Sequence, residues 1–405
     1  MATFALIYSF NVFLDPIAET FDRSTGQVSM IFALQSIVSF GGAGILGLFI
    51  DRYGNRRLLL IGSVLIASGL FVVGQADRFF TVIIVYGVIV SVGLGLTYVI
   101  AYATPPRWFQ RRRGIATAIA VSGSSFGIVV GPPVANALIV RYDWQIAYLI
   151  LAGISLSLLV LAALLIADSP TSFGTGTDSE FPDGDPQTAN HQGWGDQLTA
   201  VYDLARQSAF VFTVLGFLFL FIPAYVVMVH IVSHTANVGI DRQIGVFAVS
   251  FIGAMNIVGK LAFGPVTDWV GEVRAVIACS ILVGLGTISY AFVTTATGLL
   301  VSTFVFGLGY GGSAMLISPI LVRFFGQGDL NTLTGAVSVA FAVSGSVGPF
   351  LAGVGYDIFG TYVIALVIGG VLGLCGGTFF KAADWTSKRD ATASGSRTQK
   401  TTETD

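Results

Sequence analysis

Lys260 is the residue whose type and position most clearly predict chemistry in this sequence. It is the only lysine before Lys381, and it lies eight residues before Asp268 in a long apolar segment. Those residues correspond to about 12 Å of helix, and a lysine side chain can snorkel over only part of that distance. An ionised group at such depth normally faces a wet cavity or a partner. With Asn256 one helical turn earlier on the same face, it predicts an anion-binding site; the alternative is a snorkelling or structurally paired lysine.

Asp15 is the second ionisable residue inside an apolar segment. It lies seven residues before Asp22, or about 10 Å from that end of a helix. In a hydrocarbon core about 30 Å thick, Asp15 and Lys260 would differ in depth by about 8 Å. We therefore expect them to face one cavity, with Asp15 carrying a proton or pairing with Lys260 when no substrate is bound. The alternative is that Asp15-Pro16 only breaks the helix near its end.

Tyrosine and amide side chains in the same segments could complete such a site. Tyrosine hydroxyls can donate hydrogen bonds to a carboxylate, and their rings suit a small apolar anion. Tyr98 and Tyr102 share a helix face, as Asn256 and Lys260 do. Each of these side chains, taken alone, is explained more simply by packing. The predicted substrate-binding set is Asn11, Gln35, Tyr98, Tyr102, Asn256, Lys260 and Tyr310.

His230 and His234 are also four residues apart, near the end of an apolar segment. Two histidines can be part of a metal site, but the sequence offers no third or fourth ligand beside them. We therefore expect no metal and no cofactor. Polar residues at the membrane interface are the simpler interpretation, and a pH sensor is the alternative. Four serines are expected to form hydrogen bonds between helices: Ser122, Ser124, Ser344 and Ser346.

The elements that must position these residues are membrane helices. The 405-residue chain is 54% hydrophobic and 10% charged, whereas soluble domains carry about 25% charged residues. Apolar runs of about 18 or more residues follow one another, each long enough to cross the hydrocarbon core, and they lack the alternation of barrel strands. The predicted fold class is an all-α membrane protein with twelve transmembrane helices. These are expected at 2–21, 26–50, 58–76, 79–104, 114–139, 144–167, 209–234, 242–267, 275–295, 297–322, 332–356 and 361–380.

A polar turn between the second and third runs is repeated at half-chain distance. Residues 47–57 return 217 positions later as residues 264–274, so that Gly47, Asp51, Gly54 and Arg57 correspond to Gly264, Asp268, Gly271 and Arg274. Further pieces of the fourth and fifth runs recur in the tenth and eleventh. The chain is therefore predicted to be two pseudo-symmetric six-helix bundles, 1–167 and 209–380, joined by a cytoplasmic linker loop, 168–208, and followed by a flexible cytoplasmic tail, 381–405.

The arginines in the short connections predict the orientation of the chain. Nine lie on one side of the membrane and four on the other, and positive loops favour the cytoplasm. Both termini are then cytoplasmic, in a multi-pass protein of the plasma membrane. The first apolar run begins at Met1 and is expected to be kept as a span.

The turn at 47–57 resembles the signature loop between spans 2 and 3 of the major facilitator superfamily, and the resemblance covers the whole chain. It implies a secondary transporter with its substrate site between the two bundles. It also implies a cytoplasmic gate, in which the Asp of the turn engages a helix terminus and arginines. The alternative is that the arginines only anchor the loop. The gate residues so implied are Gly47, Asp51, Arg52, Gly54, Arg56 and Arg57, with Asp268, Gly271 and Arg274 in a weaker second copy.

A narrower resemblance points to the monocarboxylate transporter and oxalate:formate antiporter group. Residues 8–16, 93–109 and 111–116 are similar to segments of that group. Its monocarboxylate carriers have an Asp and an Arg four residues apart in span 8, where this chain has Asn256 and Lys260. The positive charge is kept and the acid is a neutral amide, which argues against a proton relay at position 256.

The leading hypothesis is a secondary active transporter of a small organic anion, a monocarboxylate or short dicarboxylate. It would work by alternating access, with proton symport or anion exchange. Its partners would be that anion, the lipid bilayer, and protons or a counter-anion, with no nucleic acid. A drug or cation exporter, or a non-transporting receptor or scaffold on the same fold, remains the alternative. The sequence has no Gly-x-x-x-x-Gly-Lys-Ser/Thr loop and no paired catalytic acids in its spans, so no enzyme is expected.

Overall fold

The computed structural model describes residues 1–43, 45–46, 53–103, 113–166, 206–326 and 330–402. In this part of the chain each of the twelve predicted spans contains a helix, which confirms the predicted fold class. Ten of the described helices are long and apolar enough to cross a membrane. The segments α1 and α2 are not among these ten, and α1 carries Asp15 and Glu19 within its length.

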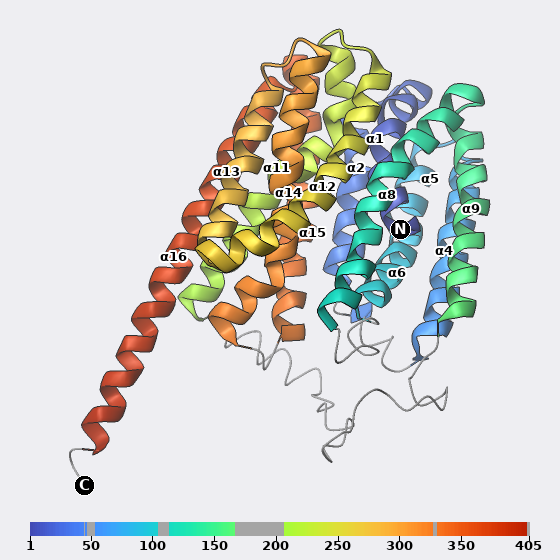
Figure 1. Ribbon diagram of the computed structural model, residues 1–405. Helices are drawn as coiled ribbons and strands as arrows, with labels where there is room; N and C mark the ends of the chain where they lie inside the picture. The colour runs from blue at the N-terminus through green and yellow to red at the C-terminus, as the bar shows by residue number, and fades with distance from the viewer. Residues whose placement is uncertain (44, 47–52, 104–112, 167–205, 327–329, 403–405) are drawn as a thin grey trace.

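The first six spans form one bundle, which we call the N bundle (Figure 1). Two of its spans change from α-helix to π-helix near their middle, and the side chain of Ser39 in one donates a hydrogen bond to the carbonyl of Ser91 in the other at 2.8 Å. Its elements are α1 (Ala2–Phe21), α2 (Thr25–Ser36), η1 (Ile37–Gly41), α4 (Asn55–Val73), α5 (Phe79–Ile84), η2 (Val85–Val90), α6 (Ser91–Ala103), α8 (Arg113–Arg141) and α9 (Trp144–Leu165).

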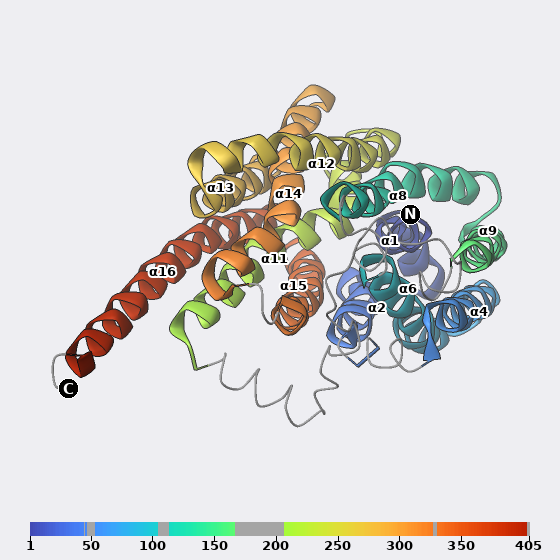
Figure 2. The same ribbon diagram turned by 60° about the horizontal axis from the view of Figure 1, so that its bottom comes forward.

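The last six spans form the C bundle (Figures 1 and 2). The main element pairs that join it to the N bundle are α2 with α15, η1 with α15, α8 with α12, and α1 with α11. The elements of the C bundle are α11 (Ser208–Asn237), α12 (Arg242–Val270), α13 (Glu272–Tyr290), α14 (Ala296–Phe325), α15 (Leu330–Phe359) and α16 (Val363–Thr402). We call the end of the molecule where α1 meets α2 the outer end, following the arginine distribution, and the opposite end the inner end.

The last glycine of the repeated turn has the same backbone conformation in both copies. Gly54 precedes α4 with φ 85° and ψ 154°, and Gly271 precedes α13 with φ 83° and ψ 159°. Side chains with a Cβ avoid this region, so both positions require glycine. The internal repeat predicted from the sequence therefore has a counterpart in the structure at single-residue level.

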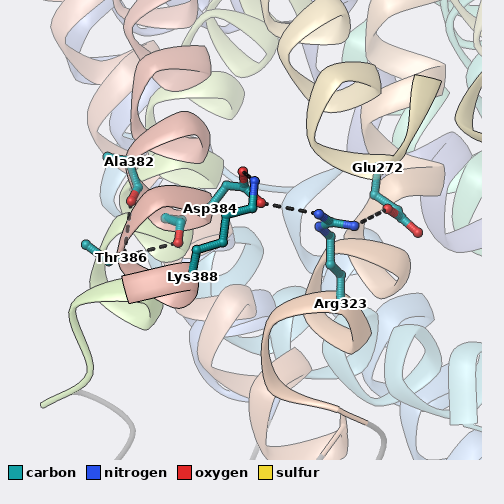
Figure 3. Close-up of polar contacts among 7 residues, drawn as sticks. Glu272, Arg323, Ala382, Asp384, Thr386 and Lys388 are labelled. Atoms are coloured by element: carbon teal, nitrogen blue, oxygen red, sulfur yellow. Dashed lines mark hydrogen bonds and ion pairs between the residues drawn. The ribbon is translucent and has the colours of Figure 1, made fainter. Parts of the chain in front are cut away.

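The last helix differs from its prediction, because α16 continues to Thr402 where a flexible tail was expected from residue 381. An ion-pair network at the inner end ties this extension to the bundle (Figure 3). Arg323, near the end of α14, contacts Glu272 of α13 at 3.0 Å and Asp384 of α16 at 3.3 Å. Asp384 also pairs with Lys388 one turn later. These contacts and the intrahelical bonds support the helix beyond the apolar run.

Candidate functional site

Lys260 lies in the contact between α8 and α12, one of the main contacts between the two bundles. Its Nζ donates to Ser125 Oγ at 2.8 Å and to Ser124 Oγ at 3.4 Å. Ser125 Oγ in turn donates to Asn256 Oδ1 at 2.7 Å. The two serines are neutral, so they orient the ammonium group without cancelling its charge.

Close helix packing makes this chain of hydrogen bonds possible. A Cβ on Gly253 would lie 2.8 Å from the backbone nitrogen of Val129 and 3.0 Å from the carbonyl oxygen of Ser125. A glycine here lets the backbones of α8 and α12 approach until short side chains can bond across the gap. Ser125 and Asn256 are buried, whereas Lys260 is only half-buried. The structure thus brings Asn256 and Lys260 together through Ser125.

Asp15 lies at the outer end and contacts other partners than the sequence predicted. Its Oδ1 accepts a hydrogen bond from Ser233 Oγ at 2.6 Å, and its Oδ2 lies 3.8 Å from Arg242 Nη1. Arg242 Nη2 also donates to the carbonyl of Val12 at 2.8 Å. The predicted pairing of Asp15 with Lys260 is therefore wrong in this conformation.

Helix length explains the error. Arg242 opens α12 at the outer end, and Lys260 follows 18 residues later, about 27 Å further along the helix. Asp15 meets the beginning of α12 rather than its inner half. The alternative interpretation of Asp15-Pro16 as a helix break is also wrong, because α1 continues through Pro16 to Phe21.

Polar and aromatic side chains meet between the two bundles in the middle of the molecule. The hydroxyls of Tyr8 in α1 and Tyr310 in α14 are hydrogen-bonded at 2.8 Å. Asn11 Nδ2 donates to the carbonyl of Met228 in α11 at 3.1 Å. Tyr98 packs edge-on against Phe40, with 5.3 Å between ring centroids. Three of the predicted residues, Asn11, Tyr98 and Tyr310, thus belong to this central region or its wall.

Gln35 is buried with a side-chain amide whose two polar atoms have no hydrogen-bond partner among the described residues. A buried amide left unsatisfied costs about 1–3 kcal/mol. The Oδ1 atom of Asn11 and the Oγ atom of Ser36 are in the same situation. Such groups mark places that a polar ligand or water would satisfy. The side chain of Tyr102 lies outside the described residues.

The predicted cytoplasmic gate falls only partly within the described structure. Gly47, Asp51 and Arg52 lie outside the described residues, so the interactions of that turn stay a prediction. The remaining gate residues occupy helix ends at the inner end: Gly54, Arg56 and Arg57 at the start of α4, Asp268 in the last turn of α12, and Gly271 and Arg274 at the start of α13.

Both histidines are buried in the interior of the protein. His230 and His234 are each 1% exposed. The Nε2 atom of His230 lies 2.9 Å from the carbonyl oxygen of Pro349, and that of His234 lies 2.9 Å from the carbonyl oxygen of Tyr290. Each ring therefore links α11 to a neighbouring segment of the C bundle.

Ser125, Arg242 and Ser233 were not singled out from the sequence as functional residues. Ser125 follows the Ser122-Gly123-Ser124 segment, in which the two serines are expected to form helix contacts, and Arg242 is one of the four arginines on the less positive side of the membrane. Ser125 and its partner Asn256 are 131 residues apart in the chain, and Ser233 and its partner Asp15 are 218 apart. Such pairing leaves no local pattern, because it arises only when two bundles dock.

Comparison with known proteins agrees with this architecture. The profile of the Major Facilitator Superfamily matches residues 1–259 and 235–403. Bovine monocarboxylate transporter 13 is 25% identical over 379 residues, covering 92% of this chain and 84% of that protein. Mouse monocarboxylate transporter 2 is 22% identical over 387 residues, covering 93% and 80%. The agnestins efflux protein AgnL12 of Paecilomyces divaricatus is 25% identical over 344 residues, covering 84% and 74%.

A solved structure agrees in fold. The crystal structure of a single-residue mutant of the nucleoside transporter NupG superposes with a TM-score of 0.72 at 14% identity, covering 94% of this chain and 97% of that one. At this identity the likeness concerns the arrangement of helices and not the substrate. With two repeated bundles, a matching fold and a profile match along almost its whole length, the chain belongs to the major facilitator superfamily.

Proposed function

We propose that this protein is a secondary active transporter of a small organic anion, a monocarboxylate or short dicarboxylate. The anion would bind between the bundles and move by alternating access, driven by proton symport or by exchange for a counter-anion. The observation that carries the proposal is the ammonium group of Lys260, held by Ser125 in the contact between α8 and α12. The similarity to monocarboxylate transporters supports the same substrate class.

The substrate would be recognised by charge first and by shape second. Lys260 provides a positive charge deep in the apolar zone, where an anion gains most from it. Lysine is a point donor rather than a planar fork, so it specifies carboxylate geometry less tightly than arginine. The hydroxyls of Tyr98, Tyr102 and Tyr310 and the amides of Asn11, Gln35 and Asn256 are proposed to complete the site.

Uptake into proteoliposomes tests the proposal. Labelled lactate, pyruvate, acetate, formate and oxalate are offered with and without a pH gradient. We expect at least one of them to be taken up, and Lys260→Gln to abolish that uptake. The matched control is Lys381→Gln, because Lys381 is exposed on α16 and its removal changes the net charge equally. Unchanged anion uptake by Lys260→Gln would reject the assigned role.

Export of a larger organic compound is the second candidate, supported by the similarity to an efflux protein. An efflux assay separates export of such a compound from anion uptake. Proteoliposomes preloaded with a hydrophobic drug or with an aromatic acid would release it on energisation if the protein is an exporter. A release of the drug that is insensitive to Lys260→Gln would favour this alternative over anion transport.

We also propose how the chain is oriented and in which membrane it lies. We place both termini and the linker 168–208 in the cytoplasm and the protein in the plasma membrane, on the arginine distribution. Asp51, Arg52, Arg56 and Arg57 would close the cytoplasmic side when the outer side is open, together with the second copy around Asp268 and Arg274.

A further inference from the structure

A carboxylate of the C bundle completes a helix of the N bundle at the outer end. Asp357, near the end of α15, accepts a hydrogen bond from the backbone N–H of Thr25 on Oδ1 at 2.9 Å and from that of Gly26 on Oδ2 at 2.8 Å. These are the first two residues of α2. The first N–H groups of a helix have no partner within it, and the helix dipole favours a negative charge there.

The capping residue of α2 itself leaves these two donors to Asp357. Ser24 Oγ accepts from the backbone N–H of Gln27, and the Gln27 side chain accepts from the backbone N–H of Ser24. This capping box serves neither Thr25 nor Gly26. The α2 terminus is therefore fully bonded only while the two bundles are in contact.

The backbones of α2 and α15 are too close at this point for any side chain. A Cβ on Gly26 would lie 2.8 Å from Asp357 Oδ2 and 2.8 Å from Val354 Cγ2. A Cβ on Gly353 would lie 2.7 Å from Ser29 Oγ and 2.9 Å from the Cα atom of Gly26. Two glycines facing each other across the bundles let the carboxylate reach the helix end.

A second contact at the same end runs in the opposite direction. Asp15 of the N bundle reaches Ser233 and Arg242 of the C bundle. Each bundle thus contributes one carboxylate that bonds to groups of the other bundle. Both contacts must separate before the bundles can part at the outer end.

We propose that Asp357, Gly26 and Gly353 form the latch of an outer gate, with Asp357 bound to the α2 terminus when that gate is closed. Opening transfers the N–H groups of Thr25 and Gly26 and the Asp357 carboxylate to water. The latch acts at the end opposite the repeated turn, so it is distinct from the cytoplasmic gate. It requires only that the two bundles move apart, whatever the substrate is.

A distance measurement between spin labels tests the latch without any transport assay. Labels are attached to cysteines replacing Asp77 in the N bundle and Thr294 in the C bundle, both exposed at the outer end, after Cys279 and Cys375 are replaced by alanine. We expect Asp357→Ala to raise the population with a long inter-label distance several-fold. The matched control is Asp143→Ala, which removes the carboxylate that caps α9 within the N bundle by accepting from Ile146 N–H at 2.7 Å.

A second variant keeps the carboxylate and changes only the fit. Gly26→Ala introduces the Cβ that collides with Asp357 and Val354, so it should also increase the long-distance population, in a chain that still carries the acid. An unchanged distance distribution in both variants would overturn the proposal. Equal shifts in Asp357→Ala and Asp143→Ala would also overturn it, because the effect would then be general loss of a helix cap.

Discussion

Among the single residues, Lys260 carries a half-buried positive charge that bonds to neutral hydroxyls. Lys260 donates to Ser125, and Ser125 donates to Asn256, so one serine fixes both the ammonium group and the amide. The order of donors is imposed by chemistry, because an ammonium group can only donate and an amide oxygen can only accept. The position of Lys260 should therefore depend on Ser125.

Replacing Ser125 by alanine tests this dependence. The change removes one acceptor from Lys260 and one donor from Asn256, and hydrogen bonds to charged groups contribute about 1.5–3 kcal/mol. We expect the KM for the transported anion to rise about tenfold or more, measured as initial uptake rates in proteoliposomes. Ser346→Ala is the control, because Ser346 bonds within its own helix, to the carbonyl of Val343. A KM equal in both variants would contradict the role of Ser125.

Asp15 is the proposed proton-coupling residue, and its neutral mimic gives a pH prediction. Protonation of Asp15 would remove the ion pair with Arg242, so acidification would loosen this contact. Asp15→Asn imitates the protonated state at every pH, and we therefore expect uptake that no longer responds to a pH gradient. Glu19→Gln, an exposed carboxyl one turn later on α1, is the control. If Asp15→Asn keeps the pH dependence, another group carries the proton.

At the scale of elements, the turn before α4 and the turn before α13 show how the two bundles reuse one piece of chain. Gly54 and Gly271 share a backbone conformation that only glycine adopts easily. In each copy this glycine is the residue directly before the next helix at the inner end. The glycine that is repeated in the sequence is the feature that reflects this shared backbone conformation.

Alanine at these positions should destabilise the protein. A residue with a Cβ held in this region costs about 1–3 kcal/mol. We expect Gly54→Ala and Gly271→Ala each to lower the melting temperature in detergent, followed by a fluorescent thiol probe or by light scattering. Gly153→Ala is the control, since Gly153 lies within α9 and a Cβ there would meet no atom within 4 Å. Equal melting temperatures in all three variants would show that the turns relax.

At the scale of the whole molecule, two bundles are held together by a limited set of contacts. The hydrogen bonds between them run from Asp357 at the outer end, through Tyr8 and Tyr310, to Lys260. The proposed linker 168–208 connects the bundles in sequence. Because the helices of each bundle pack extensively against one another, the linker's main effect should be to raise the effective concentration of one bundle near the other.

Splitting the chain within the proposed linker tests whether the two bundles can fold and assemble as separate chains. We expect residues 1–190 and 191–405, produced together as separate chains, to copurify and to take up the same anion as the intact protein. A break between Met228 and Val229 inside α11 is the control and should abolish assembly, because it cuts a buried helix. Failure of the first pair to copurify, with both chains inserted in the membrane, would contradict two separately folding bundles.

Local features of the sequence were enough to predict the class of the protein and the order of its helices. Segment length and hydropathy predicted twelve helices, and the repeated glycines and aspartates predicted two related bundles. These properties are local, because the hydrocarbon core forces each apolar segment to bond its own backbone as a helix. The presence of Lys260 and Asn256 on one helix face was likewise readable from their spacing.

The pairing of side chains could not be predicted in this way and depends on the folded arrangement of the helices. Asp15 contacts Arg242 instead of Lys260, and Lys260 donates a hydrogen bond to Ser125. Asp357 accepts a hydrogen bond from the first residue of α2. These partners lie more than a hundred residues apart and belong to different bundles. Their contact depends on how the two bundles pack against each other, and this packing is set by shape and small residues spread over many helices rather than by any local pattern.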